Sequence, residues 1–146
     1  MKQRNILIAG AGSAGTMMAN HLKRKLNHHE WKITIVDEAT THYYQPGFLF
    51  LPFGIYDEHE IQKPITKYIP DDVDFINTAI DKIEPERNVL TLINGAELPY
   101  DILIIASGCS IAPEETPGMK DKLWYKDIFD FYSFDGAKAL HDKLKN

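Results

Sequence analysis

Two stretches of the chain, Ile6–Ala9 and Ile102–Ala106, are continuously apolar, with no alternation of polar and apolar positions. This pattern is typical of parallel strands that are buried on both faces. We therefore expect both stretches to be central strands of a parallel sheet. A third strand is expected at Lys32–Val36, which ends at Asp37. Together they predict an α/β fold.

Helical spacing of apolar residues appears in two places. Met18, Leu22 and Leu26 recur on one face between the first two strands, and basic residues crowd the end of that segment, where cations suit the helix dipole. Near the end of the chain, Ser133 is a predicted N-cap. The residues expected on the apolar face of that last helix are Ala137, Leu140 and Leu144.

The middle of the chain mixes short extended and turn-rich segments. Residues 38–60 are predicted to leave the sheet with one short helical turn, and residues 65–68 to form a short helix. Between Val73 and Tyr100 the pattern is extended, and Asn94-Gly95 is a strong hairpin signal. This region predicts an antiparallel β-meander inserted between the parallel strands.

The segment Gly10–Gly15, GAGSAG, has the GxGxxG spacing and follows the first strand directly. Gly10 allows a tight turn, Gly12 has no side chain to keep a diphosphate from the backbone, and Gly15 lets the next helix approach closely. The N–H groups at the start of that helix then favour an anion. The combination predicts a Rossmann-like dinucleotide-binding unit.

An acid ends the second strand. Asp37 lies 22 residues after Gly15, where a carboxylate accepts hydrogen bonds from ribose hydroxyls and repels a 2′-phosphate. FAD or NAD is therefore expected in preference to NADP. The alternative is a glycine-rich turn next to an ordinary surface acid.

Composition limits the remaining choices. With 146 residues, 44% apolar residues and a net charge of −5, the chain is expected to be one globular domain over 1–146. The only basic block is Lys23–Lys25, which argues against a nucleic-acid partner.

The single cysteine, Cys109, excludes an internal disulfide framework, and the histidines lack the spacing of a metal site. No segment is long and apolar enough for a membrane span, and without a secretory signal we expect a cytoplasmic protein.

With these residues in view, the chain resembles the N-terminal part of sulfide:quinone oxidoreductases. These are FAD-dependent relatives of the pyridine nucleotide-disulfide oxidoreductases and of the type II NADH dehydrogenases. The resemblance covers nearly the whole chain. The stretches that carry it are GAGSAG at 10–15, THYYQPGF at 41–48, YDILIIASGCSIAPEETPG at 100–118 and FYSFDGAKAL at 131–140.

The resemblance implies FAD bound in an extended pose, with its diphosphate on the glycine-rich loop, its ribose at Asp37, its adenine near Ala79 and its flavin beside residues 44–46. Ser107 stands where the family usually has threonine. The implied FAD-binding residues are Gly10, Gly12, Ser13, Ala14, Gly15, Asp37, Glu38, Tyr44, Gln45, Pro46, Ala79, Ala106, Ser107 and Gly108.

The resemblance also implies an activity, in which two electrons pass from sulfide through cysteine sulfur to the flavin and then to a quinone. That chemistry needs two thiols, and the chain has only Cys109. Cys109 is the one catalytic candidate, and an ordinary half-buried thiol is the alternative. The second dinucleotide-binding domain and a membrane-contacting region are expected to be absent, so this chain alone is expected to be catalytically incomplete.

Several alternatives stay open. The chain could be a stand-alone, non-catalytic dinucleotide-binding module, or a fragment of a type II NADH:quinone reductase. As a fragment, it would expose an apolar edge and form homo-oligomers, and its full-length enzyme could lie peripherally at the inner membrane. Tyr43, Tyr44 and Phe48 could either stack near a flavin or fill the core.

Overall fold

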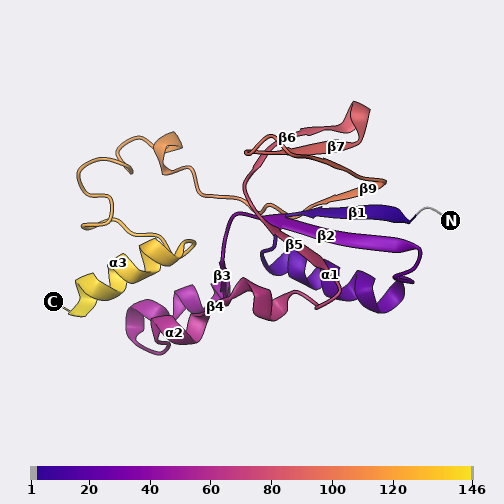
Figure 1. Ribbon diagram of the computed structural model, residues 1–146. Helices are drawn as coiled ribbons and strands as arrows, with labels where there is room; N and C mark the ends of the chain where they lie inside the picture. Colours follow the sequence, from indigo (N-terminus) through magenta and orange to yellow (C-terminus); the bar gives the residue numbers. More distant parts are fainter. Residues whose placement is uncertain (1–2, 146) are drawn as a thin grey trace. The chain divides into compact units, whose positions relative to one another are not determined.

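The computed structural model describes residues 3–145 (Figure 1). Its contacts divide the chain into two compact units. The first contains the residues up to His42 together with Pro64–Gly108, and the second contains Tyr43–Lys63 together with the residues from Cys109 onward. The assignment of residues 1–146 to one FAD-binding domain stays a prediction.

A four-stranded parallel sheet forms the centre of the first unit, with strand order β5-β2-β1-β9. Helix α1, Ser13–Lys25, connects β1 to β2. The predicted βαβ unit and the α/β fold class are therefore confirmed. The strands are β1 Arg4–Ala9, β2 Trp31–Asp37, β5 Asp74–Asn77 and β9 Ile102–Ile105.

Both faces of this sheet are covered, as the uninterrupted apolar pattern of β1 predicts. On one face, Ile6 and Ile8 pack with Ala19 of α1. On the other face, Leu7 packs with Leu90 of the β-meander, which is fully buried. Figure 1 shows α1 and the meander on opposite sides of the strands. Burial of apolar area on both faces stabilises this three-layer arrangement.

The antiparallel meander is shorter than predicted. It contains β6 Ile80–Glu84, β7 Val89–Leu92 and β8 Glu97–Pro99. The hairpin at Asn94-Gly95 is confirmed, because Gly95 has a φ of +83° and β7 and β8 pair on either side. The prediction was wrong for β5, which pairs with β2 in parallel. Four residues of mixed polarity do not distinguish a parallel edge strand from the first strand of a meander.

Two further predictions about the first unit were wrong in part. β9 pairs only with β1 among the described strands, so it lies at the sheet edge instead of the centre, and Ile105 is 65% exposed. In α1, Met18 is exposed, whereas Gly15, Thr16 and Ala19 are buried. Small residues form the inner face there because the helix packs closely against the sheet.

The second unit contains a small core of its own, in which Phe48, Leu51, Ile61 and Ala137 are buried. Residues 38–60 contain more helical turns than the single one predicted. The short elements are the β3 strand Thr41–Tyr43, the 3₁₀ turns Gln45–Leu49 and Leu51–Phe53, helix α2 Glu58–Ile61 and the β4 strand Gln62–Pro64, which pairs with β3. Within residues 3–145 the remaining 3₁₀ turns are Pro85–Arg87, Pro113–Glu115 and Ile65–Tyr68. A short helix was predicted at the last of these.

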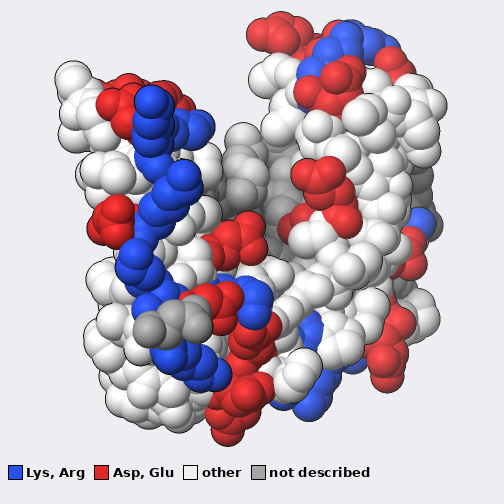
Figure 2. Space-filling view, turned by 90° about the vertical axis from the view of Figure 1, so that its left-hand side faces the viewer, with Lys and Arg blue, Asp and Glu red and all other residues white. Residues whose placement is uncertain are grey.

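Helix α3, Phe134–Lys145, ends the described chain. The N-cap prediction is confirmed, because the N–H of Gly136 donates to Oγ of Ser133 at 3.0 Å. On the face drawn in Figure 2, Lys and Arg side chains form a narrow band beside Asp and Glu. One exposed pair joins Lys143 to Asp127 at 3.0 Å, and such pairs are worth at most about 1 kcal/mol. Within residues 3–145 no helix is long and apolar enough to cross a membrane.

Candidate functional site

The loop between β1 and α1 makes a turn that only glycine can make at its first position. Gly10 has a φ of +105°, and its N–H donates to the carbonyl of Val36 at 2.8 Å. A Cβ at Gly10 would lie 2.3 Å from the carbonyl oxygen of Ala106. The loop therefore lies directly against the ends of β2 and β9, so the carboxyl ends of three parallel strands meet at one place.

The other two motif glycines differ in what surrounds them. A Cβ at Gly15 would lie 1.9 Å from the carbonyl oxygen of Gly10, so α1 approaches the loop too closely for any side chain. A Cβ at Gly12 would meet nothing within 4 Å, and the residue is exposed. Gly15 thus allows α1 to pack against the loop, whereas Gly12 leaves open space above the loop.

Helix α1 begins at this open space. Its N-cap is Gly12, which makes no side-chain capping bond, and its first turn contains no acid. The first hydrogen bond of the helix runs from the N–H of Thr16 to the carbonyl of Gly12 at 3.0 Å. The N–H groups of residues 13–15 precede that bond and are directed out of the helix end, where the dipole favours an anion.

The carboxylate of Asp37 lies beside the loop at the end of β2. Its Oδ2 accepts the N–H of Ala11 at 2.6 Å, and its Oδ1 accepts the N–H of Ala39 at 2.8 Å. A carboxylate offers about four acceptor positions, so two remain for further donors. This places an oriented acid next to the open helix end.

Sequence reasoning missed Asn77, at the end of β5. Its side-chain amide donates to the carbonyls of Asp37, Glu38 and Ala39 at 2.9, 3.0 and 3.1 Å. The available signal was its place at the end of a strand, like Asp37. Ala79, the predicted adenine neighbour, follows two residues later, and the Glu38 side chain is exposed.

The second predicted strand end also reaches the loop. Ala106 donates its N–H to the carbonyl of Ala9 at 2.7 Å, and Ser107 and Gly108 follow it with exposed positions. Gly108 has a φ of +71°. The first unit therefore brings together three groups of predicted site residues: the glycine-rich loop, Asp37 and residues 106–108.

The remaining candidates belong to the second unit. Cys109 is exposed, so the alternative of a half-buried thiol is wrong, because Cys109 lies in the loop that follows β9. Its sulfur lies 2.8 Å from the hydroxyl of Tyr132, and this hydrogen bond raises the pKa of Tyr132. Gln45 donates to the carbonyl of Tyr132 at 3.4 Å, so these three residues form one cluster.

The aromatic candidates divide between the core and the surface. Phe48 is 4% exposed and packs with Tyr43 in the core of the second unit. Tyr44 is 52% exposed and contacts Tyr56 edge-on, and Pro46 is exposed in the first 3₁₀ turn. In the described part of the chain, no three His, Cys, Asp or Glu side chains form a group that could hold a metal ion.

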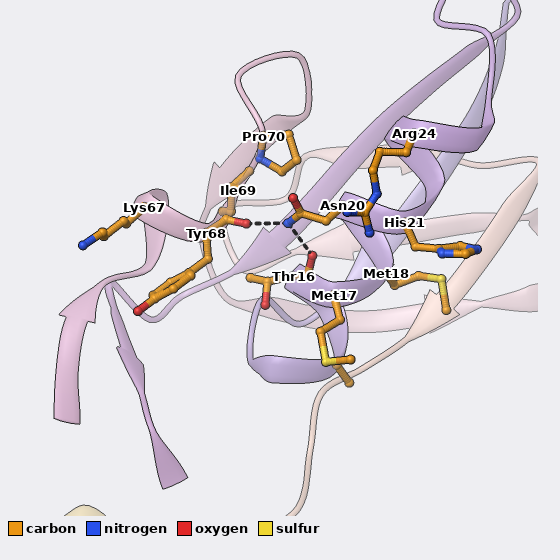
Figure 3. A pocket seen from close by; sticks show the side chains of 11 residues that line it. Thr16, Met17, Met18, Asn20, His21, Arg24, Lys67, Tyr68, Ile69 and Pro70 are labelled. Carbon is orange, nitrogen blue, oxygen red and sulfur yellow. Dashed lines mark hydrogen bonds between the residues drawn. The ribbon is translucent and has the colours of Figure 1, made fainter. Parts of the chain in front are cut away.

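A groove of about 940 Å³ runs along the outer side of α1 (Figure 3). Asn20 lies at its middle and donates to the carbonyls of Thr16 and Tyr68, both at 2.8 Å. The groove is lined by α1 and residues 67–70 and includes neither Asp37 nor Ala79. Asn20 therefore ties the segment before β5 to the helix, and the groove reaches Ala14 of the glycine-rich motif at the start of α1.

Comparisons with known proteins agree with the α/β fold of the chain. Residues 4–146 match the family model described as pyridine nucleotide-disulphide oxidoreductase. The chain is similar to the mitochondrial sulfide:quinone oxidoreductase of Dictyostelium discoideum, with 26% identity over 97% of this chain and 31% of that protein. It is also similar to the NADH-rubredoxin oxidoreductase of Clostridium acetobutylicum, with 33% identity over 100% of this chain and 37% of that protein.

Among solved structures, the sulfide:quinone oxidoreductase of Aquifex aeolicus has the same fold over 97% of this chain, with a TM-score of 0.77 and 22% identity. This chain covers 32% of that structure. The chain thus spans about a third of the length of the relatives it matches. Proteins of the matched family and the sulfide:quinone oxidoreductases are FAD-binding flavoproteins.

Proposed function

The chain belongs to the pyridine nucleotide-disulphide oxidoreductase family, and we propose that it is the FAD-binding part of a flavin-dependent oxidoreductase of the sulfide:quinone type. The observation that carries the proposal is the open helix end at Gly12 with the oriented Asp37 beside it. One group suits a diphosphate and the other suits a ribose, and FAD contains both.

The residues present fit that cofactor. A diphosphate would lie over the backbone of residues 12–15, where a Cβ at Gly12 would otherwise stand. The two free acceptor positions of Asp37 suit the two hydroxyls of an adenosine ribose and repel a 2′-phosphate. Ala79 follows the end of β5 and would border the adenine, and residues 106–108 follow the end of β9 and would form a second contact with the cofactor.

When bound, FAD supplies a carrier for two electrons. The chain's own residues would hold and orient it. For the longer enzyme we propose sulfide as the electron donor and a quinone as the acceptor, since several relatives carry those names. Cys109 is the sulfur candidate within this chain, and its exposed position leaves it accessible to a small sulfur donor. We further propose a cytoplasmic location, with peripheral contact at the inner membrane in the longer enzyme.

The cofactor proposal is tested by equilibrium titration of the chain with FAD and with NAD, followed by absorbance and fluorescence. We expect FAD to bind and Asp37→Ala to weaken it about tenfold or more, because a hydrogen bond to a charged group contributes about 1.5–3 kcal/mol. Asp81→Ala is the matched control, since Asp81 is an exposed acid on β6. Binding of NAD with no binding of FAD would refute the proposal.

A second candidate is the corresponding part of an NADH-dependent reductase. The similarity to the Clostridium NADH-rubredoxin oxidoreductase and to a type II NADH:quinone oxidoreductase of Staphylococcus haemolyticus, at 29% identity, supports it, as does the single cysteine. Reduction of the flavin in the full-length protein by sulfide or by NADH separates the two candidates.

The edge of the sheet bears on whether the chain functions alone. Ile102 is 44% exposed and Ile105 is 65% exposed on β9, whose outer edge pairs with no described strand. An apolar edge of this kind favours association. Sedimentation is expected to show self-association for a fragment, whereas a monodisperse monomer would support a stand-alone module.

A further inference from the structure

Asn77 holds the turn that follows β2. It lies opposite Asp37 in the parallel register of β5 and β2. Its Nδ2 donates to three consecutive carbonyls, those of Asp37, Glu38 and Ala39. A side-chain amide has two N–H donors and no charge, so one small group can satisfy all three acceptors by sharing its hydrogens.

The carboxylate of Asp37 bonds to the same turn. Oδ1 accepts the N–H of Ala39, within the turn, and Oδ2 accepts the N–H of Ala11, in the glycine-rich loop. The rotamer of Asp37 therefore depends on where the backbone of residues 37–39 lies, and the hydrogen bonds from Asn77 help to hold that backbone in place.

We propose that Asn77 is a positioning residue, which keeps the Asp37 carboxylate oriented toward the hydroxyls of a bound ribose. The inference rests on the proposed function, because it concerns how the same site recognises its cofactor. It assigns the ribose selectivity of the site to two residues from neighbouring strands. Asparagine is required because aspartate would place oxygen against three carbonyl oxygens, and alanine would provide no donor.

If Asn77 acts only in folding, a different result is expected. If Asn77 only stabilises the turn, its loss lowers the unfolding temperature but weakens every ligand by the same factor. If it orients Asp37, its loss weakens ligands with a 2′-hydroxyl more than ligands without one. The ratio of two affinities therefore separates the two roles.

The experiment compares ADP with 2′-deoxy-ADP on the wild-type chain, Asn77→Ala and Asn94→Ala. Asn94 is the matched control, because its side chain also organises a turn, accepting the N–H of Ala96 at 3.0 Å, in the β7–β8 hairpin. For wild type and Asn94→Ala we expect ADP to bind about tenfold more tightly than the deoxy compound, the effect of one hydrogen bond to a charged group. For Asn77→Ala we expect that ratio to fall to about 2 or less. An unchanged ratio in Asn77→Ala would overturn the inference, whereas failure of the wild-type chain to bind ADP and FAD would overturn the proposed function instead.

Amide hydrogen exchange provides a second readout without any ligand. We expect Asn77→Ala to speed exchange at Ala11 and Ala39 about tenfold, with the amides in the middle of β1 unchanged. Equal protection of Ala11 and Ala39 in both proteins would also overturn the inference. Should Asn77→Ala fail to fold, Asn77→Ser gives the same readouts, because its single hydroxyl donor cannot serve three carbonyls.

Discussion

Replacement of Gly12 by alanine separates the proposed ligand contact from the stability of the fold. Gly12 has a φ of −65° and a ψ of −165°, an extended conformation that alanine also adopts. An added Cβ would meet no atom within 4 Å. Loss of glycine flexibility in the unfolded chain stabilises by about 0.4–1 kcal/mol, and alanine is a poorer N-cap than glycine by a similar amount. The free energy of unfolding is therefore expected to stay within about 1 kcal/mol of wild type.

The effect on cofactor affinity should be much larger. The new methyl group occupies the surface on which we place the diphosphate, and it removes at least one charge-assisted hydrogen bond from the N–H groups of residues 13–15. Each such bond is worth about 1.5–3 kcal/mol, so the Kd for FAD should rise by about 10- to 150-fold. Flavin fluorescence titration measures the affinity, and thermal unfolding measures the stability. A folded Gly12→Ala protein that binds FAD like wild type would refute this placement of the diphosphate.

Three further outcomes follow from the same structure. Gly15→Ala should destabilise the fold by about 1–3 kcal/mol or more in thermal unfolding, because the added Cβ would lie 1.9 Å from the carbonyl oxygen of Gly10. A Gly15→Ala protein as stable as wild type would contradict this packing. Leu90→Ala should lower the free energy of unfolding, measured with urea, by about 2–5 kcal/mol, because Leu90 is fully buried between the meander and the sheet. A smaller loss than that of Ile93→Ala, at an exposed site, would contradict this burial. Cys109→Ala should lower the pKa of Tyr132 toward its ordinary value, because the hydrogen bond to the Cys109 sulfur raises that pKa. A ¹³C NMR titration of the Tyr132 ring measures the pKa, and an unchanged value would contradict the contact.

The sequence predicted the first βαβ unit well because every signal there is local. The apolar run of β1, the glycine spacing and the acid at the end of β2 each reflect a requirement of the backbone within a few residues. The Asn94-Gly95 hairpin was found for the same reason, since a two-residue turn with positive φ specifies its own strands.

Most of the errors concern contacts between residues far apart in the sequence. β5 and β9 were placed in the meander and at the sheet centre, yet strand order depends on partners far away in the sequence. Asn77 was missed because its three hydrogen bonds reach residues about 40 positions earlier. Met18 was placed on the inner face of α1 because it is apolar, but the close approach at Gly15 selects small residues there instead.

A crystal structure of the chain with bound FAD tests the proposed cofactor site most directly. We expect the diphosphate oxygens to lie within hydrogen-bond distance of the N–H groups at the start of α1, and the adenosine ribose hydroxyls to bond to the carboxylate of Asp37. FAD bound elsewhere, for example in the groove beside Asn20 and Tyr68, or a ribose turned away from Asp37, would contradict it.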